Sequence, residues 1–183
     1  MKITIGFSGA AGKGVNTAGL FLAEILAEKG YSFWADKEYA SIIKGDNNCF
    51  FISLSDGEEV QLSQKVDLFF AFDGFSVEKN KELYQLEHII DLSTAQATYQ
   101  NTFAFGACLG IVQIPLSEGE AVLKSHLDGK DLEGNFADLQ AGYSFGKQQY
   151  STLCQLFDLS EKRGTSKTLM MGNQLIGEGA IKA

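Results

Sequence analysis

The pattern of apolar and polar residues predicts alternating strands and helices in the first half of the chain. Five segments have the composition or alternation typical of strands: residues 2–7, 31–35, 49–54, 66–72 and 88–92. Apolar residues recur at helical spacing from Val15 to Leu26, and a second helix is predicted for residues 76–86. Strands that alternate with helices in this way indicate an α/β fold.

The second half is predicted to be mainly helical. Residues 103–112 are apolar and rich in small side chains, as in a buried helix. Ser117 followed by Glu120 forms a capping-box pattern, which predicts a helix from there to about Leu127. A further helix follows Asn135, and the polar residues 160–168 are predicted to form a loop.

Composition and charge narrow the range of functions. The chain of 183 residues has 15 basic and 23 acidic side chains, a net charge of −8. An acidic chain is a poor match for nucleic acid and for anionic membrane surfaces, because both need a basic footprint. There is neither a signal-peptide pattern nor an apolar run long enough to span a bilayer. We therefore expect a cytoplasmic protein.

The cysteines and histidines are too few and too scattered for a metal site. Cys49, Cys108 and Cys154 lie far apart and form no CxxC pair, which argues against zinc-ribbon, thioredoxin-like and iron–sulfur sites. The chain has only two histidines, so a histidine-rich metal site is also excluded. Free thiols in a reducing compartment fit this pattern best.

A glycine-rich turn between the first strand and the first helix is the clearest local signal. Gly9, Gly12 and Gly14 surround Lys13 in the segment SGAAGKG. Backbone N–H groups and the helix dipole at such a turn favour a phosphate or a carboxylate. The glycine order is the reverse of the Rossmann fingerprint, and the spacing does not fit a Walker P-loop. Anion binding and simple close packing of strand and helix therefore both stay open.

Other acidic and basic residues are expected near the same sheet edge. Asp36 lies about twenty residues beyond the glycine turn, where a ribose-binding acid would sit in a dinucleotide-binding module. Lys44, in the polar segment 36–48, could pair with an anion, although a solvated loop explains that segment too. Asp73 ends an apolar strand and could face a ligand crevice or simply terminate the strand.

An ordered series of motifs resembles the gamma domain of the 2-oxoacid:ferredoxin (acceptor) oxidoreductases. The segments that carry the resemblance are residues 5–31, 37–56, 66–73, 101–127 and 134–143, so it covers essentially the whole chain. The resemblance implies a three-layer α/β/α domain with a mostly parallel central sheet and a Rossmann-like first unit. It also implies a gamma component in the coenzyme A-dependent oxidative decarboxylation of a 2-oxoacid, inactive on its own.

The resemblance assigns candidate ligand-binding residues to two motifs. Gly9, Gly12, Gly14 and Thr17 match the family's glycine loop and helix start, whereas Glu38, Tyr39 and Gly45 match its second motif. The other two candidates depart from the family's pattern, because Lys13 stands where glutamine is usual and Lys44 where arginine is usual. Asp46 and Ser53 also differ, replacing a glycine and an arginine. No residue of the chain is assigned a catalytic role.

The resemblance further implies which parts of the enzyme lie elsewhere. Thiamine diphosphate and iron–sulfur clusters are expected on other domains or subunits, and the chain is expected to hold no cofactor alone beyond a contact with coenzyme A. Residues 1–170 would form the gamma-type domain. Residues 171–183 resemble the junction to a thiamine-pyrimidine-binding domain, which predicts a longer, fused alpha-type subunit.

Two alternatives remain at this stage. One is a stand-alone nucleotide- or dinucleotide-binding module, and the other is a non-catalytic assembly domain without a small ligand. The aromatic-rich chain is also expected to expose apolar surface when isolated, which would favour a homodimer.

Overall fold

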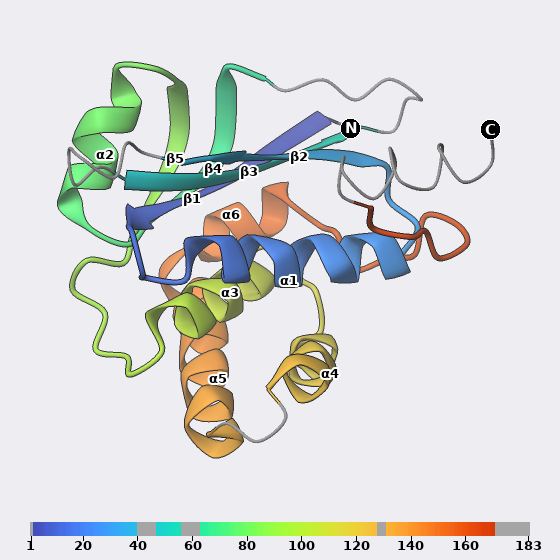
Figure 1. The fold of residues 1–183 in the computed structure, drawn as a ribbon. Coiled ribbons are helices and arrows are strands. Elements are labelled where there is room, and N and C mark those ends of the chain that lie inside the picture. The colour runs from blue at the N-terminus through green and yellow to red at the C-terminus, as the bar shows by residue number, and fades with distance from the viewer. Residues whose placement is uncertain (1, 40–46, 56–62, 128–130, 171–183) are drawn as a thin grey trace, which may run out of the picture.

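The fold is an α/β domain built on one five-stranded sheet (Figure 1). The computed structural model describes residues 2–39, 47–55, 63–127 and 131–170. The strands in that part of the chain are β1 (Lys2–Ala10), β2 (Phe33–Glu38), β3 (Asn47–Ser55), β4 (Lys65–Ala71) and β5 (Gln85–Asp91). Its helices are α1 (Val15–Glu28), α2 (Gly74–Lys81), α3 (Gln100–Ile111), α4 (Leu116–His126), α5 (Leu132–Gln149) and α6 (Ser151–Leu156). Lys44, Gly45 and the predicted junction 171–183 lie outside the described residues.

The sheet is mixed, with strand order β2-β3-β1-β4-β5. β1 pairs in parallel with β4, and β4 with β5, whereas β3 is antiparallel to both β1 and β2. Four of the five described strands therefore run in one direction and β3 runs in the other. The prediction of a mostly parallel sheet is right for strand direction, but half of the pairings are antiparallel.

The first strand–loop–helix–strand unit departs from a Rossmann unit. β1 and β2 run in the same direction, but β3 lies between them, so the two strands are not neighbours. The connection from β2 to β3 is too short for a crossover, and such connections join antiparallel neighbours. Asp36 is thus two strands, about 10 Å, from β1, and its register places it level with Gly6 rather than with the glycine loop. This separation weakens its predicted role as a ribose-binding acid.

Helices cover both faces of the sheet, in agreement with the predicted three layers. α1 and α3 lie beneath one face with α4, α5 and α6, and α2 packs on the other (Figure 1). Phe7 and Phe70 stack at 5.0 Å between their ring centroids in the core on the α1 side. A smaller cluster around Phe51 and Phe69 fills the α2 side.

The boundaries of α2 and α4 differ from the predicted ones. α2 begins at Gly74 because the Asp73 carboxylate accepts the Ser76 backbone N–H as its N-cap, and the helix ends at Lys81. Leu86, predicted to be helical, instead pairs with Val66 in β5. The prediction of a capping box formed by Ser117 and Glu120 was wrong. α4 begins at Leu116, and its N-cap, Pro115, makes no side-chain hydrogen bond. Within the described ranges, no helix has both the length and the apolar character needed to cross a membrane.

Candidate ligand-binding site

The glycine loop connects Ala10, at the end of β1, to Val15, at the start of α1. Gly12 and Gly14 have φ angles of 86° and 76°, in the left-handed region that glycine adopts without strain. A side chain at Gly14 would also collide with Asn101, since its Cβ would lie 2.7 Å from the Asn101 Cβ. At Gly9, a Cβ would lie 2.8 Å from that of Phe72. Gly9 therefore serves close packing, whereas the other two glycines shape the loop.

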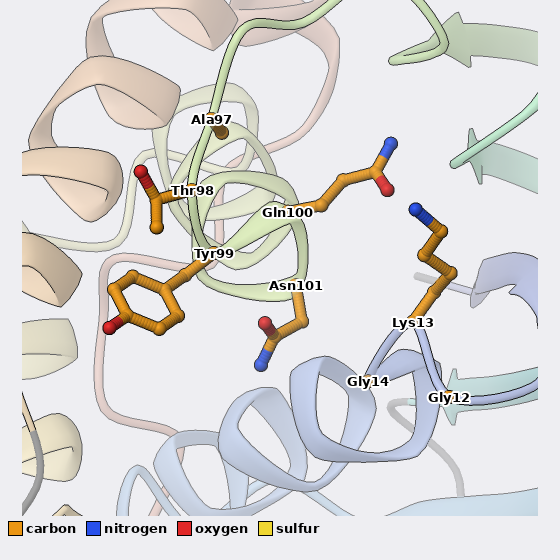
Figure 2. A pocket seen from close by; sticks show the side chains of 8 residues that line it. All are labelled: Gly12, Lys13, Gly14, Ala97, Thr98, Tyr99, Gln100 and Asn101. Atoms are coloured by element: carbon orange, nitrogen blue, oxygen red, sulfur yellow. The ribbon is translucent and has the colours of Figure 1, made fainter.

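A pocket of about 290 Å³ opens beside this loop. It is lined by Gly12, Lys13 and Gly14 on one side and by residues 97–101, which lead into α3, on the other. Figure 2 shows the side chains of Lys13 and Gln100 extending toward one another, with Asn101 beside the loop. The structure thus brings together three of the candidate ligand-binding residues.

The electrostatics of the pocket suit an anion. Both segments of its wall lead into the N-terminus of a helix, and neither the N-cap of α1, Gly14, nor that of α3, Tyr99, makes a side-chain capping hydrogen bond. The first backbone N–H groups of a helix have no acceptor within it, and they carry the positive end of its dipole. The exposed Lys13 adds a positive charge, and no acidic partner for it lies among the described residues. Phosphate and carboxylate groups are the ligands that such a site attracts.

The α3 side of the pocket is held in place by hydrogen bonds. Gln100 Nε2 donates to the Phe72 carbonyl oxygen at 2.7 Å, which fixes the start of α3 against the end of β4. The backbone N–H of Tyr99 donates to Asp138 Oδ2 at 2.6 Å. The hydrogen bond that the Tyr99 hydroxyl donates to Asp131 raises the pKa of that tyrosine.

The second family motif lies at the same sheet edge but not in this pocket. Glu38 pairs in register with Cys49, on the face of the sheet opposite α1, and it accepts a hydrogen bond from the Tyr84 hydroxyl. Burial first, and then this contact with Glu38, raises the pKa of Tyr84. Tyr39 follows β2 and is 67% exposed. Thr17, on α1, does not line the pocket either. Glu38 is therefore a partner of Tyr84 in this fold.

Sequence reasoning missed the residues on the α3 side of the pocket. Tyr99 and Gln100 were not candidates, and Asn101 entered only as the first residue of a segment that carries the family resemblance. A usable signal was present, because this segment follows β5, and ligands of α/β sheets bind beyond the carboxyl ends of strands.

The cysteines do not form a cluster-binding set. Cys49 Sγ donates to Ser8 Oγ at 3.2 Å or to Asn80 Oδ1 at 3.3 Å, Cys108 is fully buried in α3, and Cys154 lies on α6. Among the described residues, no group of three or more histidine, cysteine or acidic side chains could hold a metal ion. The residues present thus do not suit an iron–sulfur cluster.

Comparison with known sequences identifies relatives of the chain. Residues 4–96 match the sequence profile of the family described as pyruvate ferredoxin/flavodoxin oxidoreductase. A 2-oxoacid:ferredoxin oxidoreductase subunit alpha from a Sulfolobus species is 30% identical over 98 residues, 54% of this chain and 15% of that protein. The corresponding subunit from Saccharolobus solfataricus is 30% identical over 77 residues, 42% of this chain and 12% of that protein. The matches thus span only a small part of these curated relatives.

Solved structures share the fold. A 2-oxoglutarate:ferredoxin oxidoreductase from Magnetococcus marinus, with 2-oxoglutarate, coenzyme A and succinyl-CoA bound, superposes with a TM-score of 0.70 and 20% identity, over 98% of this chain and 37% of that one. The gamma subunit of a keto/oxoacid ferredoxin oxidoreductase from Geobacter sulfurreducens PCA superposes with a TM-score of 0.63 and 19% identity, over 79% of this chain and 95% of that one. At these identities the likeness establishes the α/β fold.

Proposed function

The chain belongs to the pyruvate ferredoxin/flavodoxin oxidoreductase family, and from this membership we propose that it is the gamma component of a 2-oxoacid:ferredoxin oxidoreductase. The observation that carries the proposal is the family match over residues 4–96, which includes the glycine loop and both flanking elements. In this role the domain contributes to assembly and to the coenzyme A side of oxidative decarboxylation. We also propose that residues 1–170 form the gamma-type domain.

We infer that the glycine-loop pocket receives an anionic group of coenzyme A. Coenzyme A carries several phosphate groups, and the pocket offers Lys13 and two helix N-termini. A structural neighbour from Magnetococcus marinus has coenzyme A bound, which supports the choice of ligand. Lys13 would act as a point charge on a phosphate, whereas the backbone N–H groups would orient it.

Thiamine diphosphate and the iron–sulfur clusters are assigned to other domains or subunits of the complex. Those groups supply the decarboxylation and electron-transfer chemistry, and the described residues of this chain offer no ligand set for a metal. The three cysteines are free thiols, in agreement with a cytoplasmic, reducing location.

Exposed apolar side chains also favour a chain that works within an assembly. Trp34, Phe75 and Leu83 are 55%, 53% and 58% exposed, on β2 and around α2. Large apolar side chains at the surface are common where one protein contacts another.

The proposal is tested by purifying the tagged protein from its own host cells and recording native mass spectra. We expect recovery with thiamine diphosphate and iron–sulfur clusters, either on co-purified subunits or on the same chain. The assembly should reduce ferredoxin with a 2-oxoacid only when coenzyme A is present. Recovery of the tagged protein without these groups, together with a nucleotide, would instead support a nucleotide-binding module.

A further inference from the structure

Asp73 joins the glycine loop to the start of α2. Its Oδ2 atom accepts the backbone N–H of Ala10 at 3.0 Å, and its Oδ1 atom accepts the backbone N–H and the hydroxyl of Ser76 at 2.8 and 2.7 Å. Ala10 is the last residue of β1, immediately before the glycine loop. Both carboxylate oxygens are thus engaged, and Asp73 does not line the pocket.

The link extends through a buried network to β3 and back to β1. Asn47 Nδ2 donates to Ser76 Oγ at 2.6 Å, and Asn47 pairs with Ala10 in the antiparallel register. One turn further along α2, Asn80 Nδ2 donates to Ser8 Oγ at 3.1 Å. Ser8, Ser76 and Asn80 are at most 1% exposed. A satisfied network of this kind holds its members rigidly, because each broken hydrogen bond would leave a buried polar group unpaired.

We propose that Asp73 is a positioning residue for the ligand of the glycine-loop pocket. This inference rests on the proposed function, because it takes coenzyme A as that ligand. Only four residues separate Ala10 from α1, so a shift of the Ala10 amide moves Lys13 and the first N–H groups of α1. A carboxylate is suited to the task because a hydrogen bond to a charged acceptor is stronger than one to a neutral acceptor. The sequence left open whether Asp73 faces a ligand crevice or simply terminates its strand. In this proposal it instead holds the Ala10 amide at the start of the glycine loop.

The test uses the assembled, purified oxidoreductase with Asp73→Asn in this chain. Asparagine keeps the size of the side chain but replaces one of its two acceptor atoms with a donor. We expect the KM for coenzyme A to rise at least about fivefold, as for a typical coupling between two sites. The kcat at saturating coenzyme A and the KM for the 2-oxoacid should stay within about twofold of the wild-type values. Asp158→Asn is the matched control, since among the described residues Asp158 accepts hydrogen bonds from Ser160 and lies far from Ala10 in the sequence.

Ser76→Ala separates positioning from stability. It removes the hydrogen bonds that the Ser76 hydroxyl makes with Asp73 and Asn47 but leaves the bond from the Ala10 amide to Asp73, so we expect a less stable chain with a nearly unchanged KM for coenzyme A. An unchanged KM for coenzyme A in Asp73→Asn would overturn the proposal, as would a parallel loss of kcat and of affinity for both substrates. If wild-type complex shows no coenzyme A dependence at all, the proposed function fails before this inference is reached.

A measurement on the wild-type complex covers the case in which Asp73→Asn does not assemble. Coupling between two sites is reciprocal, so a ligand that depends on the Asp73–Ala10 bond must also stabilise it. We expect saturating coenzyme A to slow hydrogen exchange at the Ala10 amide, while the amides of α5 exchange as before. Unchanged exchange at Ala10 in a complex that turns over with coenzyme A would contradict the proposal.

Discussion

Gly142 lies against the carbonyl oxygen of Phe103, so closely that a Cβ on Gly142 would be 2.0 Å from that oxygen. The contact is reciprocated, because a Cβ on Gly106 would lie 2.2 Å from the Leu139 carbonyl oxygen. Gly106 and Leu139 belong to α3 and α5 respectively, as do Phe103 and Gly142. The two helices therefore meet backbone to backbone beneath the segment that leads into the pocket.

Gly142→Ala should destabilise the chain. Alanine favours a helix over glycine by about 1 kcal/mol, but here its methyl group would push α3 away from α5. We expect a net loss of about 1–3 kcal/mol in the free energy of unfolding, measured by urea denaturation. Gly74→Ala is the matched control, because a Cβ there meets nothing within 4 Å. Equal stability of the two variants would show that α3 and α5 can separate without cost.

Lys13→Ala should weaken the binding of coenzyme A to the assembled enzyme. Lys13 is exposed, so the loss of one point charge is expected to raise the KM for coenzyme A only about two- to fivefold. The difference should shrink at high salt, because exposed charges are screened. Lys162→Ala, which removes an exposed lysine far along the chain, is the control. Identical coenzyme A kinetics for Lys13→Ala and wild type at low salt would place the ligand elsewhere.

The Asp73 network should make stability depend on pH in the acid range. Burial alone would raise the pKa of the Asp73 carboxyl, but the hydrogen bonds from Ser76, Ala10 and Asn47 outweigh it and hold the pKa below its usual value. The folded state therefore favours the carboxylate, and this stabilisation is present above the unfolded pKa of about 3.9 and is lost as the pH falls through the folded one.

Urea titrations at several pH values from 7 to 3 check this sign. The difference in stability between wild type and Asp73→Asn should be largest near neutral pH and should shrink as the pH falls. Asp158→Asn should show a smaller effect; hydrogen bonds from Ser160 lower the pKa of Asp158 too, but that side chain is more exposed to solvent. If the difference in stability between wild type and Asp73→Asn instead widens toward pH 3, the folded state does not lower the pKa of Asp73.

The three thiols should be poorly reactive in the folded protein. Burial raises the pKa of Cys49, Cys108 and Cys154, and thiol reagents attack the thiolate. Cys49 and Cys108 are 3% and 0% exposed, whereas Cys154 is partly exposed. We expect intact-mass spectra after treatment with a disulfide reagent at pH 8 to show at most one label, on Cys154, and three in denaturant. Rapid labelling of Cys49 in the native chain would mean that its network opens readily.

Lys29 and Glu118 form an ion pair, and we expect removal of Glu118 to destabilise the chain more than removal of Lys29. Their Nζ and Oε1 atoms are 2.9 Å apart, and the side chains are 5% and 34% exposed. Glu118→Ala leaves a buried ammonium without its partner, and we expect a loss of about 1–3 kcal/mol, below that of a fully buried pair. Lys29→Met leaves only a partly solvated carboxylate and should cost less. Denaturation of both variants measures the difference, and a larger loss for Lys29→Met would contradict this account.

Local sequence patterns were enough to predict most of the elements and the fold class. The described strands of the first 92 residues and α1 were predicted at nearly their observed positions, because alternation and helical spacing report directly on which side of an element is buried. The helix predicted for residues 76–86 was wrong at its end, because α2 ends at Lys81. The glycine loop was equally visible, since the left-handed φ angles of Gly12 and Gly14 require glycine. What it binds and the roles of Glu38, Tyr39, Lys44 and Gly45 in ligand binding stay predictions.

Only the tertiary structure decided how these elements meet. The insertion of β3 between β1 and β2 puts Asp36 two strands from the glycine loop, and the sheet separates Glu38 from the pocket. The start of α3 completes the pocket, and Asp73 turns out to hold Ala10. The last two relationships join residues that are more than 60 positions apart, and all of them rest on strand pairings or side-chain contacts that no local periodicity encodes. The sequence alone thus determined the elements and the loop, and long-range packing decided the site that they build.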